Sequence, residues 1–128
     1  MLEAMRTAIA VARLRAGGRF VFDAATAFGW GLDGGGAALG MTGRLGRIAP
    51  GYAADIVVFA ADAPNLRPVI DGVGILVHSG NGSNVRDVIV AGEIVLADGQ
   101  PTRFSADDVL RDAEAVAQAL WRRARAAA

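Results

Sequence analysis

The stretch LGRIAPGYAADIVVF, residues 45–59, is where the chain changes from helical to β patterning. Pro50 and Gly51 follow each other in the order that a type II turn prefers. This turn allows the carboxylate of Asp55 to accept hydrogen bonds from backbone amides at the mouth of a strand. Residues 56–59 are β-branched or aromatic and include no polar side chain, which predicts a strand buried on both faces.

A β-hairpin is expected further along the chain. Residues 85–90 and 93–96 form two short apolar-rich runs that are separated by two residues only, Ala91 and Gly92. That spacing is typical of a tight hairpin, and Gly92 tolerates the left-handed backbone that a two-residue turn requires. Asp98-Gly99 then ends the second strand.

Helices are expected at both ends of the chain. Residues 2–15 place apolar side chains at helical spacing and stop at a pair of glycines. Near the other end, Ser105 is a candidate N-cap, with Asp108 three residues later as in a capping box. An apolar stripe runs from Val109 to Trp121, and arginines follow it where cations suit the helix dipole. Residues 126–128 are expected to fray.

The segments between these elements are less regular. Residues 20–27 fit either a strand or the start of a helix, with the helix favoured. Five glycines occur in the eight residues 29–36 (GWGLDGGG), which predicts a loop. Residues 37–40 are expected to form a short helical turn with a glycine cap. Residues 74–78 fit either a short strand or a helical turn.

Together these patterns predict an α+β fold, with terminal helices and a small, mainly antiparallel sheet between them. The 128 residues point to a single domain, which can bury roughly two-thirds of its unfolded surface. Within that domain we expect a helical part with the glycine-rich loop (1–45), a β part (46–104) and a C-terminal helix (105–128).

Composition excludes several functional classes. The 13 basic and 13 acidic residues balance, so there is no basic surplus of the kind that nucleic-acid binding requires. The longest apolar runs fall far short of the ~20 residues of a membrane span. The absence of cysteine excludes disulfides and thiolate chemistry. No signal-peptide pattern opens the chain, so a cytoplasmic location is expected.

The supply of catalytic side chains is equally limited. His78 is the only histidine, whereas a catalytic zinc site uses three protein ligands that usually include histidines. A Ser–His–Asp triad could use no other residue than His78. A lone histidine beside a Gly/Ser/Asn-rich stretch is more often structural or exposed, so His78 is a weak metal-ligand candidate. No catalytic or cofactor-binding residue is assigned.

A dinucleotide fingerprint is formally present in the glycine-rich stretch. Gly29, Gly31 and Gly34 have the required spacing, and Asp55 lies about 20 residues further on. However, no convincing strand precedes the glycines. Asp55 also comes before its strand, whereas a ribose-binding acid should follow one. A surface loop is therefore favoured over nucleotide binding.

Three stretches in combination resemble the C-terminal part of the amidohydrolase superfamily. The closest branch is the cytosine-deaminase-like enzymes, which include guanine deaminases, triazine chlorohydrolases and formimidoylglutamate deiminases. The resemblance runs from about residue 1 to residue 99, and its motifs are Ala25-Thr26 with 36–41 (GAALGM), 45–51 with 54–58, and 85–95 with Asp98-Gly99.

The resemblance implies an architecture and a chemistry. Residues 1–45 would form the end of a (β/α)8 barrel, including its last helix, and residues 46–104 part of a β-sandwich completed by N-terminal strands of the enzyme. The family hydrolyses C–N bonds with zinc or iron. Its histidine ligands have no counterpart here, and residues 1–6 resemble the stretch just after its last ligand, an aspartate. The chain alone is therefore expected to be inactive.

Without the rest of the enzyme, apolar faces and sheet edges should stay exposed. The expected partners are therefore a second copy of the chain or a separate N-terminal barrel segment. The alternative is an independent small module for oligomerisation or ligand binding. Neither nucleic acid nor membrane is expected as a partner.

Overall fold

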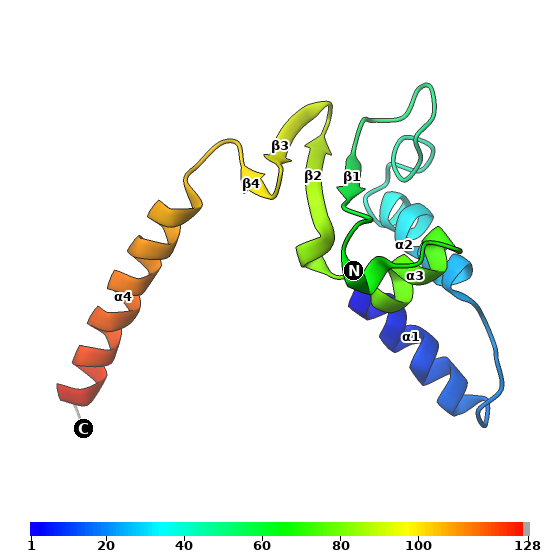
Figure 1. Ribbon diagram of the computed structural model, residues 1–128, viewed down its shortest axis with the longest axis horizontal. Helices are drawn as coiled ribbons and strands as arrows, with labels where there is room; N and C mark the ends of the chain where they lie inside the picture. The colour runs from blue at the N-terminus through cyan, green and yellow to red at the C-terminus, as the bar shows by residue number, and fades with distance from the viewer. Residues whose placement is uncertain (127–128) are drawn as a thin grey trace.

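A computed structural model describes residues 1–126 of the chain and shows an α+β fold (Figure 1). Three helices gather at one end of a small sheet, and a long helix extends from its other end. The elements in chain order are α1 (Leu2–Arg15), α2 (Ala24–Ala38), β1 (Ile56–Phe59), the 3-10 helix η1 (Pro64–Leu66), α3 (Gly72–Ser79), the 3-10 helix η2 (Gly82–Asn84), β2 (Val85–Val90), β3 (Glu93–Ala97), β4 (Gln100–Pro101) and α4 (Ala106–Ala126).

The sheet is antiparallel throughout, with strand order β1-β2-β3-β4. The predicted hairpin is confirmed, because Val90 pairs with Glu93 across a two-residue turn. Ala91 and Gly92 both have positive φ, 51° and 85°, as a type I′ turn requires. The turn before β1 is also confirmed: the Tyr52 N–H donates to the Ala49 carbonyl at 3.1 Å.

The prediction that β1 is buried on both faces is wrong. Val57 is 48% exposed, and the other residues of the strand are only half-buried. The strand lies at the edge of the sheet, and the neighbouring strands β2 and β3 are likewise only half-buried or exposed. An apolar run predicts that a strand can be buried, whereas actual burial depends on whether another layer covers it.

The core lies where α1, α2 and α3 meet. Met5 and Ile9 of α1, Ala24 and Ala27 of α2, and Val77 of α3 form one buried cluster. The Arg6 guanidinium adds a polar link, since Nη1 donates to the carbonyls of Val77 at 3.1 Å and Gly80 at 2.7 Å. The helix predicted for residues 2–15 is thereby confirmed and fixed against the end of α3.

The glycine-rich segment is helical, so the predicted loop over residues 29–36 is wrong. It continues α2, which begins after Asp23, whose carboxylate accepts from the Thr26 N–H at 2.8 Å. Each glycine costs roughly 1 kcal/mol of helix propensity. Packing offsets part of this cost, because a Cβ at Gly31 would overlap the Met5 methyl group and Gly36 is buried against Leu45. Gly31 and Gly36 thus permit close approach of neighbouring segments.

The first ambiguous segment, residues 20–27, is helical only from residue 24, where α2 begins, and residues 20–23 form neither helix nor strand. Residues 37–38 are the end of α2 and not a separate short turn, and Gly40, whose φ is +66°, follows the helix. Residues 74–78 lie within α3, because the Asp71 carboxylate caps the Gly74 N–H at 3.0 Å.

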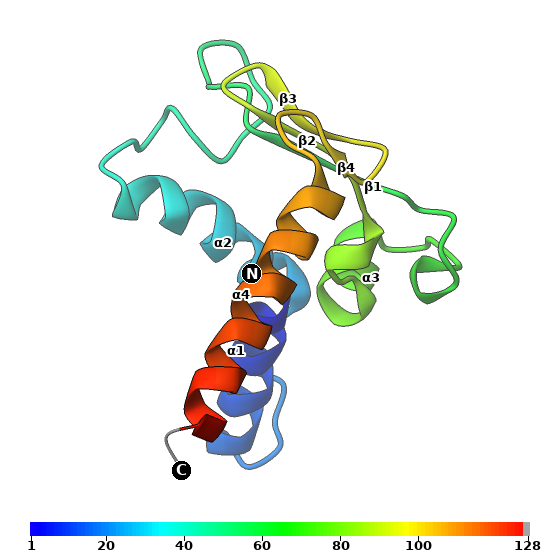
Figure 2. The ribbon, with the colours of Figure 1, turned by 90° about the vertical axis from the view of Figure 1, so that its left-hand side faces the viewer.

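The C-terminal helix α4 stands apart from the rest of the fold in Figure 1, and in the turned view of Figure 2 it passes in front of α1. Its predicted N-cap is confirmed: Ser105 Oγ accepts from the Asp108 N–H at 3.2 Å. No residue of α4 is buried. Of the residues expected to fray, Ala126 ends α4 and 127–128 lie outside the described part of the chain.

The protein exposes more surface than a compact domain of its size. Its accessible surface is 9260 Å² for 13.1 kDa, whereas a folded monomer of this mass exposes about 6400 Å². The excess indicates that apolar faces lack a covering layer. None of the helices described over residues 1–126 is long and apolar enough to cross a bilayer.

Candidate functional site

His78, the weak metal-ligand candidate, lies in the last turn of α3 and is exposed. Over residues 1–126, no group of three or more His, Asp or Glu side chains is placed to hold a metal ion. A catalytic zinc ion needs such a donor set. The described side chains therefore do not fit the metal that the family implies, and no catalytic step through a metal can be built on them.

The dinucleotide-like glycines do not form a phosphate loop. Gly29, Gly31 and Gly34 lie inside α2, downstream of its capped first turn. Backbone N–H groups at these positions serve the hydrogen bonds of the helix itself, whereas phosphate binding uses the free N–H groups at a helix N-terminus. Gly31 faces Met5 of the core. Gly31 is therefore a packing position, whereas a Cβ at Gly29 or Gly34 would meet no atom within 4 Å.

Asp55 is a structural residue. Its Oδ1 accepts a hydrogen bond from the Ala91 N–H at 2.7 Å, and the Gly92 N–H donates to the neighbouring Ala54 carbonyl at 3.1 Å. These two bonds attach the hairpin turn to the segment before β1. The prediction that this carboxylate serves backbone amides at the mouth of the strand is confirmed.

Asp33 and Arg47 form an ion pair for which no role was predicted. Arg47 Nη2 lies 3.2 Å from Asp33 Oδ2, and their side chains are 62% and 59% exposed. The hydrogen bond that Arg47 donates to Asp33 raises the pKa of Arg47, with a smaller coulombic contribution from the same carboxylate. Because both groups are in water, the pair stabilises little. It connects α2 to the turn before β1.

A hydrophobic cleft of about 550 Å³ opens between the helices and β1. Its polar side chains are Arg47 and Asp55, and Ile48 on its wall is 84% exposed. Such a lining suits packing against another apolar surface. Its apolar wall includes Met1, Leu2, Met5, Phe28, Leu32, Ile48, Ile56, Val57 and Phe59.

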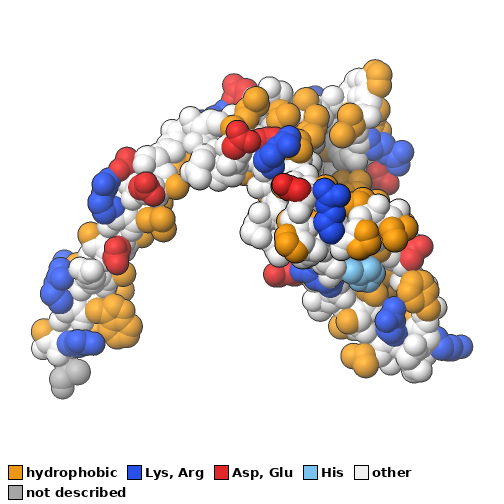
Figure 3. Space-filling view, viewed as in Figure 1, with side chains coloured by type: hydrophobic (Ala, Val, Ile, Leu, Met, Phe, Trp, Pro, Cys, Tyr) orange, Lys and Arg blue, Asp and Glu red, His pale blue; other side chains and the backbone are white. Residues whose placement is uncertain are grey.

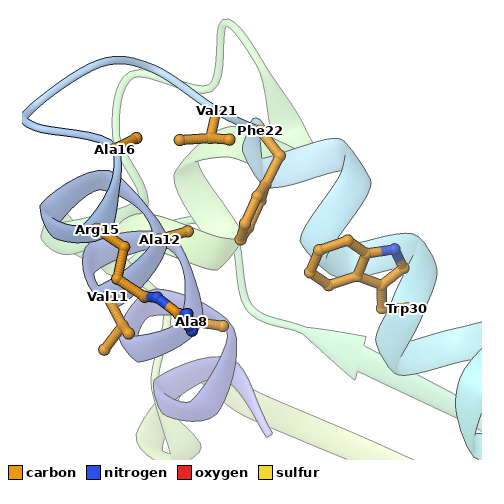
Figure 4. Close-up of a pocket in the computed structure, with 8 residues that line it drawn as sticks. All are labelled: Ala8, Val11, Ala12, Arg15, Ala16, Val21, Phe22 and Trp30. Atoms are coloured by element: carbon orange, nitrogen blue, oxygen red, sulfur yellow. The ribbon is translucent and has the colours of Figure 1, made fainter.

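A second hydrophobic groove, of about 530 Å³, runs between α1 and α2 (Figure 4). At its α2 side, the ring centroids of Phe22 and Trp30 lie 4.6 Å apart, and the two ring planes are tilted by 55°. Ala8 and Ala12 of α1 point toward them across the groove (Figure 4). Trp30 is 56% exposed, so a large apolar side chain is left without cover.

The perturbed carboxylates serve the fold. The Thr26 N–H lowers the pKa of Asp23 at the start of α2. The Asp98 N–H, followed by Arg86, lowers the pKa of Asp87 on β2. In both cases the hydrogen bond stabilises the ionised form. Each carboxylate belongs to a helix cap or a strand contact, and neither lines the two hydrophobic grooves.

The family model described as the amidohydrolase family matches residues 1–95, so the chain belongs to this family. The resemblance inferred from the sequence motifs is confirmed. The chain is 40% identical over 90 residues to the 5-methylthioadenosine/S-adenosylhomocysteine deaminase of Desulfovibrio desulfuricans, a match that covers 70% of this chain and 20% of that protein. It is 35% identical over 77 residues to the 5'-deoxyadenosine deaminase of Methanopyrus kandleri, covering 60% and 18%.

Solved structures of other proteins also resemble this chain. An adenosine deaminase from Xanthomonas campestris with bound zinc matches at a TM-score of 0.82 and 28% identity, over 89% of this chain and 26% of that one. The zinc complex of atrazine chlorohydrolase from Arthrobacter aurescens TC1 matches at 0.79 and 21% identity, over 90% and 26%, which shows the fold alone. The chain thus spans about a quarter or less of these relatives' length.

Proposed function

We propose that this chain is the C-terminal segment of a metal-dependent amidohydrolase of the deaminase type, and that it does not catalyse by itself. The observation that carries the proposal is that the fold matches a zinc-binding relative whereas the side chains do not match a zinc site. The chain has the architecture of zinc-bound relatives, yet its one histidine is exposed and the described residues include no metal-binding group.

The names of the relatives support a proposal for the substrate class. Three of them are a 5-methylthioadenosine/S-adenosylhomocysteine deaminase, a 5'-deoxyadenosine deaminase and an adenosine deaminase. We propose that the complete enzyme removes the exocyclic amino group of an adenosine derivative by hydrolysis of a C–N bond. Residues outside this chain would supply the ligands that bind the zinc or iron ion.

In this proposal, the role of the segment itself is to pack against the rest of the enzyme. The cleft beside β1 and the groove between α1 and α2 are both apolar and both open. Burying such surfaces against a barrel would stabilise the assembled enzyme by roughly 25 cal/mol for each Å² removed from water. The segment would thus support the catalytic part while leaving the chemistry to it.

A chimaera tests this function. The chain replaces the matching segment of the Desulfovibrio desulfuricans deaminase, and bound zinc and ammonia release from 5-methylthioadenosine, S-adenosylhomocysteine and adenosine are measured. We expect the chimaera to bind zinc and to deaminate, and the isolated chain to do neither. A firm equivalent of zinc on the isolated chain, with an activity that His78→Ala abolishes, would overturn the proposal.

A second candidate is an independent module for small-molecule binding. It is favoured by the volume of the cleft beside β1, about 550 Å³, which lies within the usual range for ligand pockets. Arg47 and Asp55 would supply its polar contacts. A monodisperse isolated chain whose melting temperature rises with an adenosine derivative, and is unchanged by the upstream segment, would favour this candidate.

A further inference from the structure

The C-terminal helix α4 has an apolar side that nothing within residues 1–126 covers. Hydrophobic side chains gather on the side of α4 that faces an open hollow, and charged ones lie on its outer side (Figure 3). Figures 1 and 2 together place α4 and α1 on opposite sides of this hollow. The large apolar residues of α4 are between 53% and 69% exposed: Val109, Leu110, Val116, Leu120 and Trp121.

The base of α4 is attached to the sheet. Thr102 Oγ1 donates to the Ile94 carbonyl at 2.7 Å, and Arg103 pairs with Glu93, so two successive residues contact β3. Only one residue separates this ion pair from Ser105, which caps α4. Turning α4 onto α1, α2 and α3 would break these contacts. The sheet therefore sets the direction of α4 and holds its apolar side away from the core of the chain.

The other side of the hollow is apolar as well. The N-terminus of α1 lies at its edge (Figure 1), and Met1 is 79% exposed. Between this N-terminus and the sheet lies a cavity of about 300 Å³. Its apolar lining consists of Met1, Leu2, Val57, Phe59 and Val85. A body that fills the hollow would thus meet apolar side chains on two sides.

Longer relatives include α4 in the part that matches this chain. The adenosine deaminase from Xanthomonas campestris matches 89% of the chain at a TM-score of 0.82, and the unmatched residues are fewer than the 21 residues of α4. The 5-methylthioadenosine/S-adenosylhomocysteine deaminase of Desulforudis audaxviator matches 94% of the chain at 32% identity. These matches cover only 26% and 28% of the two relatives. In both, the arrangement of α4 therefore belongs to a chain with a large further part.

We propose that the hollow between α4 and α1 receives the remaining part of a longer amidohydrolase, and that α4 packs its apolar side on that part. The helix and the start of α1 form the two sides of a clamp. Helices in proteins owe most of their stability to packing of an amphipathic face, and the sheet holds this face where its own core cannot cover it. The inference rests on the proposed function, which makes the chain a segment of a longer enzyme.

The first test is hydrogen exchange of the α4 amides, followed by mass spectrometry. The isolated chain is compared with a chimaera in which it replaces the matching segment of the Desulforudis audaxviator deaminase. We expect exchange to be slower by roughly tenfold or more in the chimaera, because packing suppresses local opening. Equally fast exchange in a chimaera that deaminates would overturn the inference and leave the proposed function intact. Slow exchange in a chimaera that does not deaminate would do the reverse.

The second test adds two carboxylates to either side of α4. By helical spacing, Ala113 and Ala117 lie on its apolar side, whereas Ala115 and Ala119 lie on its charged side. Ala113→Glu with Ala117→Glu should lower the melting temperature of the chimaera by roughly 5 °C or more relative to Ala115→Glu with Ala119→Glu, because burial removes water from the carboxylates. In the isolated chain the two pairs should give equal masses and equal melting temperatures. Circular dichroism checks that each variant keeps its helix.

Results on the isolated chain can also overturn the inference. A dimer that only the Ala113 and Ala117 substitutions dissociate, measured by light scattering, would assign the apolar side of α4 to a second copy. A monomer whose melting temperature only these substitutions lower would place α4 on its own core. Binding to vesicles of phosphatidylglycerol and phosphatidylcholine that only these substitutions abolish would assign this side to a membrane.

Discussion

Asp55 Oδ1 accepts a hydrogen bond from the Ala91 N–H at 2.7 Å, although the two residues lie 36 positions apart in the chain. The bond joins the segment before β1 to the turn between β2 and β3. It therefore stabilises the arrangement of these three strands as well as the turn itself.

Replacing Asp55 by alanine should destabilise the sheet. The change leaves the Ala91 N–H without its acceptor, and we expect a loss of about 1 kcal/mol in the free energy of unfolding, measured by urea titration. Asp55→Asn keeps the Oδ1 acceptor and should lose less. Equal stability of the alanine variant and the wild-type chain would show that water replaces this bond at no cost.

Two glycines in open surroundings should respond to alanine in opposite ways. A Cβ at Gly34 or at Gly92 would meet no atom within 4 Å, but Gly34 is helical and Gly92 has a φ of +85°. We expect Gly34→Ala to stabilise by roughly 0.5–1 kcal/mol, because alanine favours the helix. Gly92→Ala should destabilise by roughly 1–2 kcal/mol, because its Cβ strains the left-handed backbone.

Thermal unfolding of the two glycine variants beside the wild-type chain measures both effects. A rise in melting temperature for Gly34→Ala supports the helix over residues 24–38. No change, or a fall, would favour the loop that the glycine content alone predicts.

Arg6 should contribute to the packing of α1 on α3. Its Nη1 donates to the carbonyls of Val77 and Gly80 in a partly buried position, and hydrogen bonds from a charged group stabilise by about 1.5–3 kcal/mol. We expect Arg6→Ala to lower the free energy of unfolding by about 2 kcal/mol. Arg13→Ala is the control on the same helix, since Arg13 is exposed and lies over the Phe20 ring. A loss no larger than the control's would refute the role of Arg6.

The contribution of Asp87 should depend on pH. The Asp98 N–H, and then Arg86, hold the pKa of Asp87 below its usual value of 3.8. A carboxylate with a lowered folded-state pKa stabilises the fold above its unfolded pKa, and this stabilisation is lost as pH falls through the folded pKa. We therefore expect Asp87→Asn to unfold at lower temperature than the wild-type chain at pH 7.

That difference in melting temperature should shrink as the pH is lowered beneath 3.8. Melting curves of both proteins at a series of pH values measure it. A difference that stays constant down to the lowest pH would mean that the ionised form of Asp87 has no special role.

The isolated chain should bind less than a tenth of an equivalent of zinc when it is purified without chelator. A single exposed imidazole cannot replace the three protein ligands of a catalytic site. Elemental analysis of the wild-type chain and of His78→Ala measures this, and we expect no difference between them. Stoichiometric zinc that the substitution removes would make His78 a ligand, with donors from a second copy.

Local signals account for the parts of the fold that the sequence predicted well. Ala91-Gly92 and Pro50-Gly51 encode their turns because the allowed backbone angles of those residues are few. The Ser105 cap and the apolar spacing of residues 2–15 are also features of adjacent residues. The motifs that indicated the amidohydrolase family are largely these same turns and strands, which is why the family could be inferred before the fold.

Tertiary structure decided the remainder. The helix through residues 29–36 depends on contacts of Gly31 with Met5 and of Gly36 with Leu45, which lie outside the segment whose composition predicts a loop. The exposure of Val57 and the open apolar side of α4 depend on layers that are absent around them. Helix propensity and hydrophobicity describe what a segment can do, whereas burial is a relation between segments that only their packing establishes.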